Sequence, residues 1–366
     1  MNSTKLTFAC YEGTASLASI KPLWDDLFSH CHNPAFYNDW RWHAGIQEHL
    51  VEADIAYVVA SCADIPVAIV PLQRSARKHG PITASYLSLP FHVAIDLSDI
   101  VASKDLPADA FFQQLLSYLK SGFPLSWELL ELRNFAESST LYSTMRPYSQ
   151  HLESDGESAF IRASADKNLL ASVSSKQVKN AQRLARKAAS SMGALASTEY
   201  CSGPELLAAY DAFLDVESAS WKGDSGTKSA INLRPDAMAF YRQVLQGFGE
   251  TAQAAVKLLT IDGQAAAAQM GIRVADRLHL LKIGFDERFS DVGPGGILLT
   301  QCLEQEDQNQ TREVNLVTHP AWSFRWHCEI DPKHRVVFFN DTLLGRILSM
   351  SRKLLKLYKS KARKHT

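Results

Sequence analysis

The residues best suited to chemistry lie in one glycine-rich segment, Ser290-Asp291-Val292-Gly293-Pro294-Gly295-Gly296, which we expect to open into a helix at Ile297. Backbone N–H groups at the start of a helix lack intrahelical acceptors and carry partial positive charge. Glycines let a ligand approach the backbone closely, because no Cβ is in the way. The segment therefore predicts a site for a phosphate or pyrophosphate. An ordinary turn before a helix would explain the same glycines.

The surroundings of this loop exclude two common phosphate-binding motifs. No Gly-Lys-Ser/Thr follows it, so it is no P-loop. The segments 256–261, 264–274 and 278–285 read as three strands joined by the tight turns Asp262-Gly263 and Ala275-Asp276. An antiparallel meander is not the setting of a dinucleotide fingerprint. The six cysteines include no Cys-x-x-Cys pair, and we expect no metal.

Three side chains near these elements could remove a proton from a reacting group: Glu217, Asp286 and His319. Each also has a structural explanation, namely a solvated helix carboxylate, a loop-capping residue and a structural histidine. We expect Trp221, Lys222, Trp322 and Arg325 to line a substrate pocket. Core packing would account equally well for the tryptophans.

The length predicts more than one domain, because 366 residues exceed what a single core usually supports. The Ser- and Glu-rich stretch 137–165 suggests a junction, which gives domains at 1–150 and 151–340. The hairpins expected at 55–72 and 256–274 resemble each other and suggest two copies of one architecture. A basic amphipathic helix is expected over 341–366.

The order strand–strand–strand–loop–helix–strand, with Gly-x-Gly at the loop, resembles the acyl-CoA-binding core of GNAT acyltransferases. Gly284-Phe285-Asp286 and the segment Glu217–Gly223 resemble the CelD-like branch, within the two-domain FemAB-like proteins. The resemblance implies an α+β (mixed α/β) fold with two GNAT-like domains, each a mostly antiparallel central sheet flanked by helices. The N-terminal copy would be degenerate, and the C-terminal copy would bind the donor.

The resemblance also assigns residues to the donor, acetyl-CoA or another acyl-CoA. Ile283, Gly284 and Phe285 would contact its pantetheine arm, and Gly293, Gly295, Gly296 and Ile297 would cradle its pyrophosphate. Two features depart from the pattern. Ser290 stands where a Gln or Arg is usual, and the stretch Ala321–Trp326 lacks the Lys of a frequent Tyr-Lys pair.

The implied activity is N-acyl transfer to an amino sugar or another cell-envelope or exopolysaccharide precursor, either a small molecule or a lipid-linked sugar. One alternative is a FemAB-like transferase that takes its acyl group from aminoacyl-tRNA, with the basic helix near 167–190 on the RNA phosphates. The other alternative is a non-catalytic scaffold of a polysaccharide-synthesis complex.

The charge and hydropathy pattern bears on partners and location. The net charge is −1, so DNA is not an expected partner. The N-terminus is polar and no apolar run approaches the length of a membrane span, so we expect a cytoplasmic protein. The basic segment 343–366 could contact a membrane surface peripherally or simply dock as a terminal helix.

Overall fold

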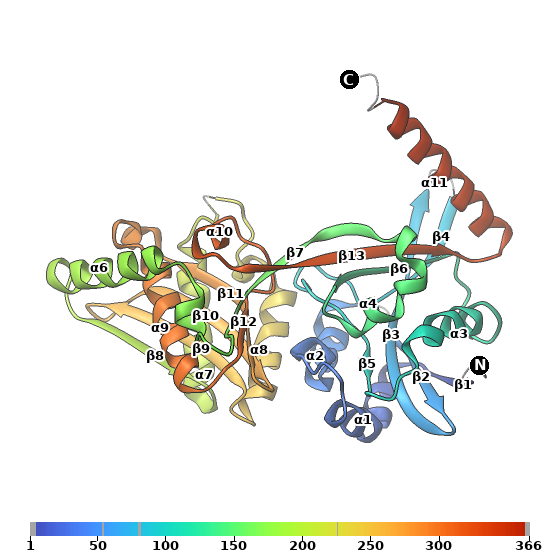
Figure 1. The fold of residues 1–366 in the computed structure, drawn as a ribbon, viewed down its shortest axis with the longest axis horizontal. Coiled ribbons are helices and arrows are strands. Elements are labelled where there is room, and N and C mark those ends of the chain that lie inside the picture. Colours follow the sequence, from blue (N-terminus) through green and yellow to red (C-terminus); the bar gives the residue numbers. More distant parts are fainter. Residues whose placement is uncertain (1–4, 53–54, 80–81, 225, 363–366) are drawn as a thin grey trace. The chain divides into compact units, whose positions relative to one another are not determined.

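The structure is a computed structural model that describes residues 5–52, 55–79, 82–224 and 226–362 (Figure 1). The chain forms two compact units, and neither is one continuous stretch. The first contains residues 1–33, 51–156 and 333–366, and the second contains 34–50 and 157–332. These units differ from the expected division at 150 and 340, chiefly because 34–50 packs with the second unit and 333–340 with the first.

The sheet of the first unit is mostly antiparallel, and among its described strands only β4 and β6 run parallel. Helices cover both of its faces: Val58 packs in a core with Phe111 and Leu115 of α3, whereas the neighbouring Tyr57 meets Trp24 of α1 edge to face. The strands, in spatial order, are β1 (Leu6–Tyr11), β2 (Ile55–Cys62), β3 (Ile65–His79), β4 (Ile82–Ser88) and β6 (Leu129–Ala136), and the helices are α1 (Thr14–Ser29) and α3 (Ala108–Ser121).

The sheet of the second unit repeats this order, again with only its fourth and fifth strands parallel. Helices α7 (Gly203–Ser218) and α8 (Pro235–Gly249) pack with each other and with the sheet, and α9 (Pro294–Gln308) packs with α6 (Ser175–Ser191) and the sheet. The strands are β8 (Leu195–Tyr200), β9 (Ala254–Ile261), β10 (Gln264–Val274), β11 (Arg277–Phe285) and β12 (Glu313–Asn315).

The shared strand order confirms the expected fold class, two GNAT-like sheets flanked by helices. One further strand lies beside the fifth strand of each sheet. In the second unit, β7 (Glu153–Arg162) pairs with β12, and Arg162 forms an ion pair with Glu313 at 2.8 Å. In the first unit, β13 (Glu329–Phe339) pairs with β6. Each copy therefore receives the strand that follows the other copy along the chain.

The hairpin turns confirm the local reading of the sequence. Ala63 and Asp64 have φ of 46° and 66°, and Asp262 and Gly263 have φ of 50° and 76°. Left-handed conformations at both central residues are the type I′ pattern, whose twist matches that of paired strands.

Several elements differ from expectation. The sequence analysis missed β1, β8 and β13, and β7 lies inside the polar stretch taken as a junction. The expected helix over 167–190 is divided into α5 (Leu169–Ser172), capped by Asn168, and α6. The remaining elements are short: β5 (Val101–Ala102), α2 (Trp40–Gly45), α4 (Thr140–Thr144), α10 (Ser323–Trp326), η1 (Phe36–Asn38), η2 (Ile46–Leu50), η3 (Arg146–His151), η4 (Ile231–Leu233) and η5 (Glu287–Val292).

The expected C-terminal helix is present as α11 (Leu343–Ala362) in the first unit. No helix within the described part of the chain is long and apolar enough to cross a bilayer.

Candidate functional site

A β-bulge in β11 shapes the site. Lys282 pairs with Met270 and Leu280 pairs with Gly271, so Leu281 has no partner on β10. The extra residue reverses the alternation of side chains beyond it. A Cβ on Gly271 would lie 2.5 Å from the carbonyl oxygen of His279, so the strands can approach closely only with glycine there. The bulge therefore decides which groups of residues 282–285 face the helices.

Beyond the bulge, one edge of β11 has no partner strand among the described residues, and we call it the open edge. Pairing with β12 is confined to residues 277–279, because β12 ends at Asn315. The N–H of Asp286 donates to Ala266 on β10 at 2.9 Å, which places alternate backbone groups toward β10. Ile283 and Phe285 then direct their N–H and C=O groups to the open edge. A ligand with amide groups could add to this edge as a strand does.

Lys222 binds this edge. Its Nζ donates to the carbonyl oxygen of Ile283 at 2.7 Å and to Oε1 of Glu217 at 2.9 Å. Glu217 is 1% exposed, and its Oε2 accepts from the N–H of Ile231 at 2.8 Å. Gly284 allows α7 to come this close, since a Cβ there would lie 3.2 Å from the Cα of Glu217. The Glu217–Lys222 pair therefore joins α7, its following loop and β11.

The loop after α7 presents Trp221 to solvent, with 54% of the residue exposed. The backbone of the loop turns back on itself: the N–H of Thr227 donates to Trp221 and that of Ser229 donates to Lys222, both at 2.9 Å. Cβ atoms on Gly223 and Gly226 would lie within 2 Å of backbone oxygens. Only glycine fits at these two positions, so the exposed indole stands on a tightly built loop.

The glycine-rich segment is more helical than expected. Residues 287–292 form η5, Gly293 is left-handed with φ of 58°, and α9 begins at Pro294 rather than Ile297. The N–H groups of Gly296 and Ile297 both donate hydrogen bonds to the carbonyl oxygen of Gly293, at 3.1 and 3.3 Å. The Gly295 N–H has no acceptor among the described residues, and no side chain caps the helix. Gly295 and Gly296 therefore lie in the first helical turn, with donors of the kind that bind anions.

Space is left around this turn. A Cβ on Gly295 would meet nothing nearer than the ring of Phe285, at 3.8 Å, and one on Gly296 would be 3.7 Å from Trp326. Phe285 itself packs beside Ile297 and Leu298. The donor-binding residues expected from the sequence, 283–285 and 293–297, are thus brought together at one end of the second unit's sheet.

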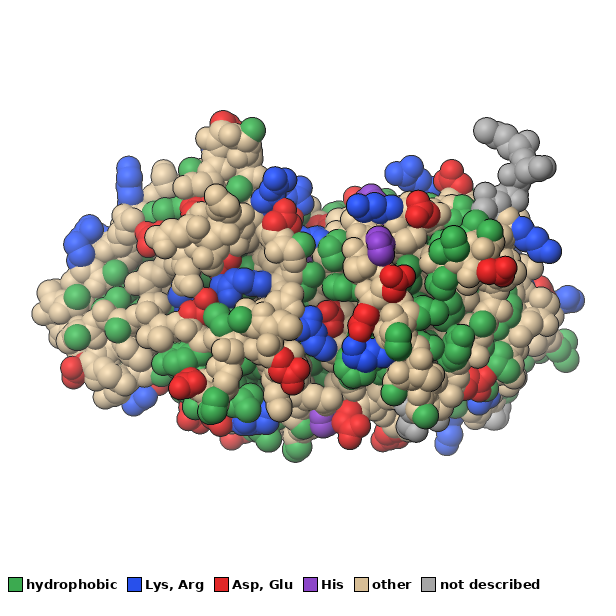
Figure 2. All heavy atoms as spheres, turned by 90° about the horizontal axis from the view of Figure 1, so that it is seen from below, with side chains coloured by type: hydrophobic (Ala, Val, Ile, Leu, Met, Phe, Trp, Pro, Cys, Tyr) green, Lys and Arg blue, Asp and Glu red, His purple; other side chains and the backbone are tan. Residues whose placement is uncertain are grey.

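The basic helix α6 passes the start of α9. Leu184 of α6 is the nearest neighbour of Gly293, 3.2 Å from a Cβ built there. The basic side chains of α6 are exposed on the same helix: Lys176, Lys179, Arg183, Arg186 and Lys187. They give this flank of the second unit positive charge. On the face shown in Figure 2, by contrast, basic and acidic side chains are interspersed.

Asp286 is engaged by Arg288. Its carboxylate accepts from the backbone N–H of Arg288 at 2.9 Å and from the guanidinium at 2.6–3.1 Å. The hydrogen bond from the Arg288 side chain holds the pKa of Asp286 below its ordinary value. Asp286 also serves as N-cap of η5.

His319 lies in the loop after β12, against Glu157 of β7. Its Nδ1 is 2.6 Å from Oε2 of Glu157, and its ring meets Phe324 of α10 at 4.5 Å. The short helix α10 also contains the buried Trp326, whose ring would lie 3.7 Å from a Cβ built on Gly296. The loop of His319 is thereby connected to the start of α9.

The remaining two residues expected in the substrate pocket are Trp322 and Arg325. Trp322 is half-buried against the core formed by α5, α6 and α9, and Arg325 is exposed. Glu157, Leu184 and Gly271 were missed by the sequence analysis. Glu157 is 162 positions from His319, and nothing in the local sequence connects the two.

The described residues of the first unit include no equivalent of the glycine-rich turn. The connection from β4 to α3, residues 89–107, contains no glycine. A cavity of about 400 Å³ in this unit is lined by residues that include Glu12, Arg74 and Ser85. No group of three metal-ligating side chains was found among the described residues.

Comparisons with known proteins bear on the family of this domain and on the fold of the chain. Residues 175–322 match the family described as an acetyltransferase (GNAT) domain. FemX is similar to this chain at a TM-score of 0.58 and 10% identity, over 92% of this chain and 99% of FemX. The C-terminal domain of an Agrobacterium fabrum protein assigned as a lysylphosphatidylglycerol synthetase matches at a TM-score of 0.52 and 12% identity, over 93% and 98% of the two chains.

At these identities the solved structures establish the fold alone. No curated protein matches the sequence closely enough to count as a relative. The matched domain contains the bulged strand, the open edge and the glycine-rich turn. Residues 175–322 therefore form a GNAT acetyltransferase domain, and the chain as a whole shares the two-domain fold of FemX.

Proposed function

We propose that this protein transfers an acyl group from acyl-CoA to the amine of an amino sugar or another envelope precursor. The observation that carries the proposal is the open edge of β11 next to the uncapped start of α9, within the matched GNAT domain. An edge that offers backbone N–H and C=O groups suits the amides of a pantetheine arm. The first turn of α9 suits a pyrophosphate.

The residues fit such a donor. Gly295 and Gly296 leave the amides of the turn accessible, and the Gly295 N–H has no acceptor among the described residues. Arg183 and Lys187 flank Leu184 on α6 and add positive charge beside this turn. Ser290 supplies no long side chain where the family usually has one, so binding here relies on backbone groups.

Transfer to an amine requires removal of a proton, and His319 is the candidate that the contacts favour. Its Nδ1 is held by Glu157, which orients the ring and leaves Nε2 to accept a proton. Glu217 and Asp286 are less suited, because Lys222 and Ile231 occupy the first carboxylate and Arg288 the second. Glu217 is better suited to position Lys222 at the β11 edge.

Trp221 supports a carbohydrate acceptor, since an exposed indole offers a flat apolar surface to the C–H face of a sugar ring. We place the acceptor beside Trp221 and Lys222, whose ammonium lies 6.0 Å from the indole centroid.

One other donor has support. The row of exposed basic side chains on α6 would suit RNA phosphates, and a FemAB-like transferase would take its acyl group from aminoacyl-tRNA. The name of the Agrobacterium fabrum neighbour, which specifies a lysylated lipid, agrees with aminoacyl transfer in this fold. A purely scaffolding role is the other alternative, and the absent Lys in Ala321–Trp326 favours it.

The test is calorimetric binding of acetyl-CoA to the wild type, Gly295→Ala and Gly295→Glu. A Cβ at residue 295 fits the space, and a glutamate in the first turn favours the helix, so both variants should fold with unchanged melting temperatures. Gly295→Ala should bind nearly as the wild type does, whereas Gly295→Glu should lose at least tenfold in affinity. No binding by the wild type, or equal binding by both variants, contradicts the proposal. Competition by aminoacyl-tRNA would favour the alternative.

A further inference from the structure

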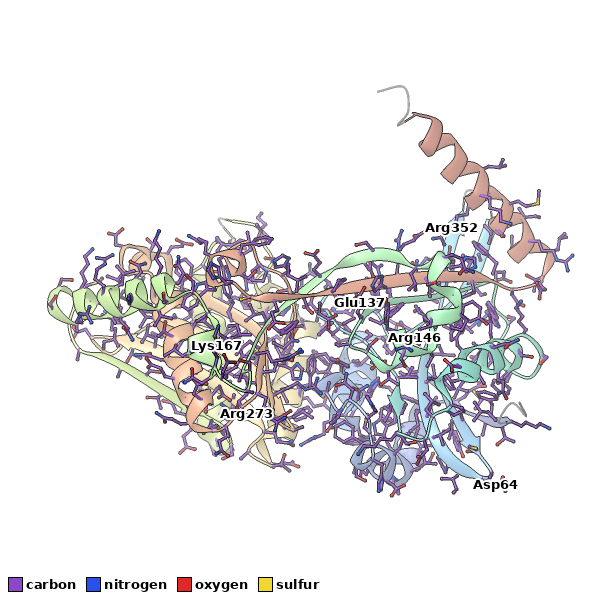
Figure 3. All side chains as sticks on the ribbon, in the orientation of Figure 1. Asp64, Glu137, Arg146, Lys167, Arg273 and Arg352 are labelled. Atoms are coloured by element: carbon purple, nitrogen blue, oxygen red, sulfur yellow. The ribbon has the colours of Figure 1, made fainter. Side chains whose placement is uncertain are left out.

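Helix α11 is fixed to the first unit by one of its faces. Leu344 and Leu348 pack against a cluster formed by Ala84, Tyr86 and Leu129. The guanidinium of Arg352 lies 2.9 Å from both carboxylate oxygens of Glu153. Figure 3 labels Arg352 on α11. The helix therefore emerges from this unit in a defined orientation.

A second apolar face of α11 has no cover in the described part of the chain. Leu343, Ile347, Met350 and Leu354 are 79%, 45%, 65% and 65% exposed. Their spacing of four, three and four residues places them in one stripe along the helix. A continuous stripe of this kind marks an interaction surface more often than scattered single apolar residues do.

The charge beside the stripe identifies the kind of partner. Arg346 and Lys353 are exposed and directly precede Ile347 and Leu354 in the sequence. No acidic residue follows Asp341, and eight basic residues do: Arg346, Arg352, Lys353, Lys356, Lys359, Lys361, Arg363 and Lys364. Two copies of such a helix would repel each other. An anionic surface would attract it, and an apolar stripe flanked by basic side chains is the pattern of helices that lie in a membrane interface.

We propose that the exposed stripe of α11 docks on an anionic lipid bilayer, with Ile347, Met350 and Leu354 in the acyl boundary and Arg346 and Lys353 at the headgroups. This surface lies in the first unit and does not depend on the proposed acyl transfer. It would hold the protein where lipid-linked acceptors are found.

The test is co-sedimentation of the full chain with vesicles of phosphatidylcholine alone and of phosphatidylcholine with phosphatidylglycerol. We expect binding to the anionic vesicles only, weakening as salt is raised. The triple variant Ile347→Ser, Met350→Ser, Leu354→Ser removes the apolar stripe. The double variant Arg346→Glu, Lys353→Glu reverses two charges. Each should reduce binding by roughly tenfold or more.

The matched control is Ile65→Ser, at another exposed apolar residue of the same unit, 68% exposed, which should bind as the wild type does. Unchanged circular dichroism and melting temperature establish that the variants fold. Equal binding to neutral vesicles, or full binding by both α11 variants, would overturn the proposal. So would a wild-type dimer in sedimentation velocity that the triple variant converts to a monomer, since a second copy would then cover the stripe.

Discussion

At the scale of single residues, the Glu217–Lys222 pair costs free energy because a carboxylate is buried, and it holds an ammonium at the open edge of β11. A carboxylate that is 1% exposed is tolerated because Lys222 and the Ile231 N–H satisfy it. Removal of one partner leaves a buried charge alone, whereas removal of both does not.

We therefore expect Lys222→Met to lose about 3 kcal/mol of unfolding free energy and Lys222→Met/Glu217→Gln to regain most of it. Denaturant titration measures both. Both variants should bind the acyl donor more weakly than the wild type does, because both lack the ammonium at the carbonyl of Ile283. A double variant as unstable as the single variant would show that the pair is not coupled.

His279 makes the second unit sensitive to acid. The ring is buried, neither nitrogen has a hydrogen-bond partner among the described residues, and Phe36 lies 5.1 Å away. Burial, with a smaller contribution from Arg277, lowers its pKa from 6.5 to about 3. The unfolded chain then binds more protons than the folded one between these values, so stability falls as the pH falls below 6.5.

At pH 5 this histidine alone should cost roughly 2 kcal/mol relative to pH 8. His43, whose pKa burial lowers to about 4, acts in the same direction in segment 34–50. Equilibrium unfolding of His279→Leu at the two pH values should show a smaller loss than the wild type. An identical loss in both proteins would exclude His279 as a source.

At the scale of elements, the bulge in β11 is the feature on which the site depends. It turns the backbone N–H and C=O groups of Ile283 and Phe285 toward the open edge, and it places Gly284 against α7. The sequence of β11 shows no glycine or proline at the bulge. The permissive glycine is Gly271 on the neighbouring strand.

Gly271→Ala should therefore destabilise the protein by about 1–3 kcal/mol, since its Cβ would lie 2.5 Å from the His279 carbonyl oxygen. It should also weaken donor binding, although residue 271 lies outside the proposed site. Gly295→Ala, where the space is open, is the control for thermal melting and calorimetry. If Gly271→Ala bound the donor as tightly as the wild type does, donor binding would not depend on the bulge.

At the scale of the whole molecule, each sheet is completed by a strand that follows the other copy along the chain. β13 follows the second copy in sequence but pairs with β6 of the first unit, where Val336 is buried in the core. The first unit is thus incomplete without residues 333–339.

A chain that ends at Pro332 should lose order in the first unit while its second unit still binds the acyl donor. Hydrogen exchange should show faster exchange in β6, whose residues 129–136 would become an unpaired edge. Deletion of residues 343–366 alone, which keeps β13, is the matched control. Unchanged protection of β6 in the shorter chain would show that β13 is dispensable.

The sequence by itself determined what depends on nearby residues. The meander 254–285, its type I′ turn at Asp262-Gly263, the glycine-rich turn before α9 and the basic α11 all follow from local spacing and turn chemistry. Local hydrogen bonding and the need for positive φ act over a few residues, so a sequence can reveal them.

Only the tertiary structure decided which distant groups meet. Glu157 reaches His319, Gly271 permits the bulge opposite it, and segment 34–50 packs in the second unit rather than the first. The strands β7 and β13 have polar, half-exposed faces, so neither their existence nor their exchange shows in the hydrophobic pattern. Pairing across long sequence separations depends on the packing of whole sheets, which no local spacing encodes.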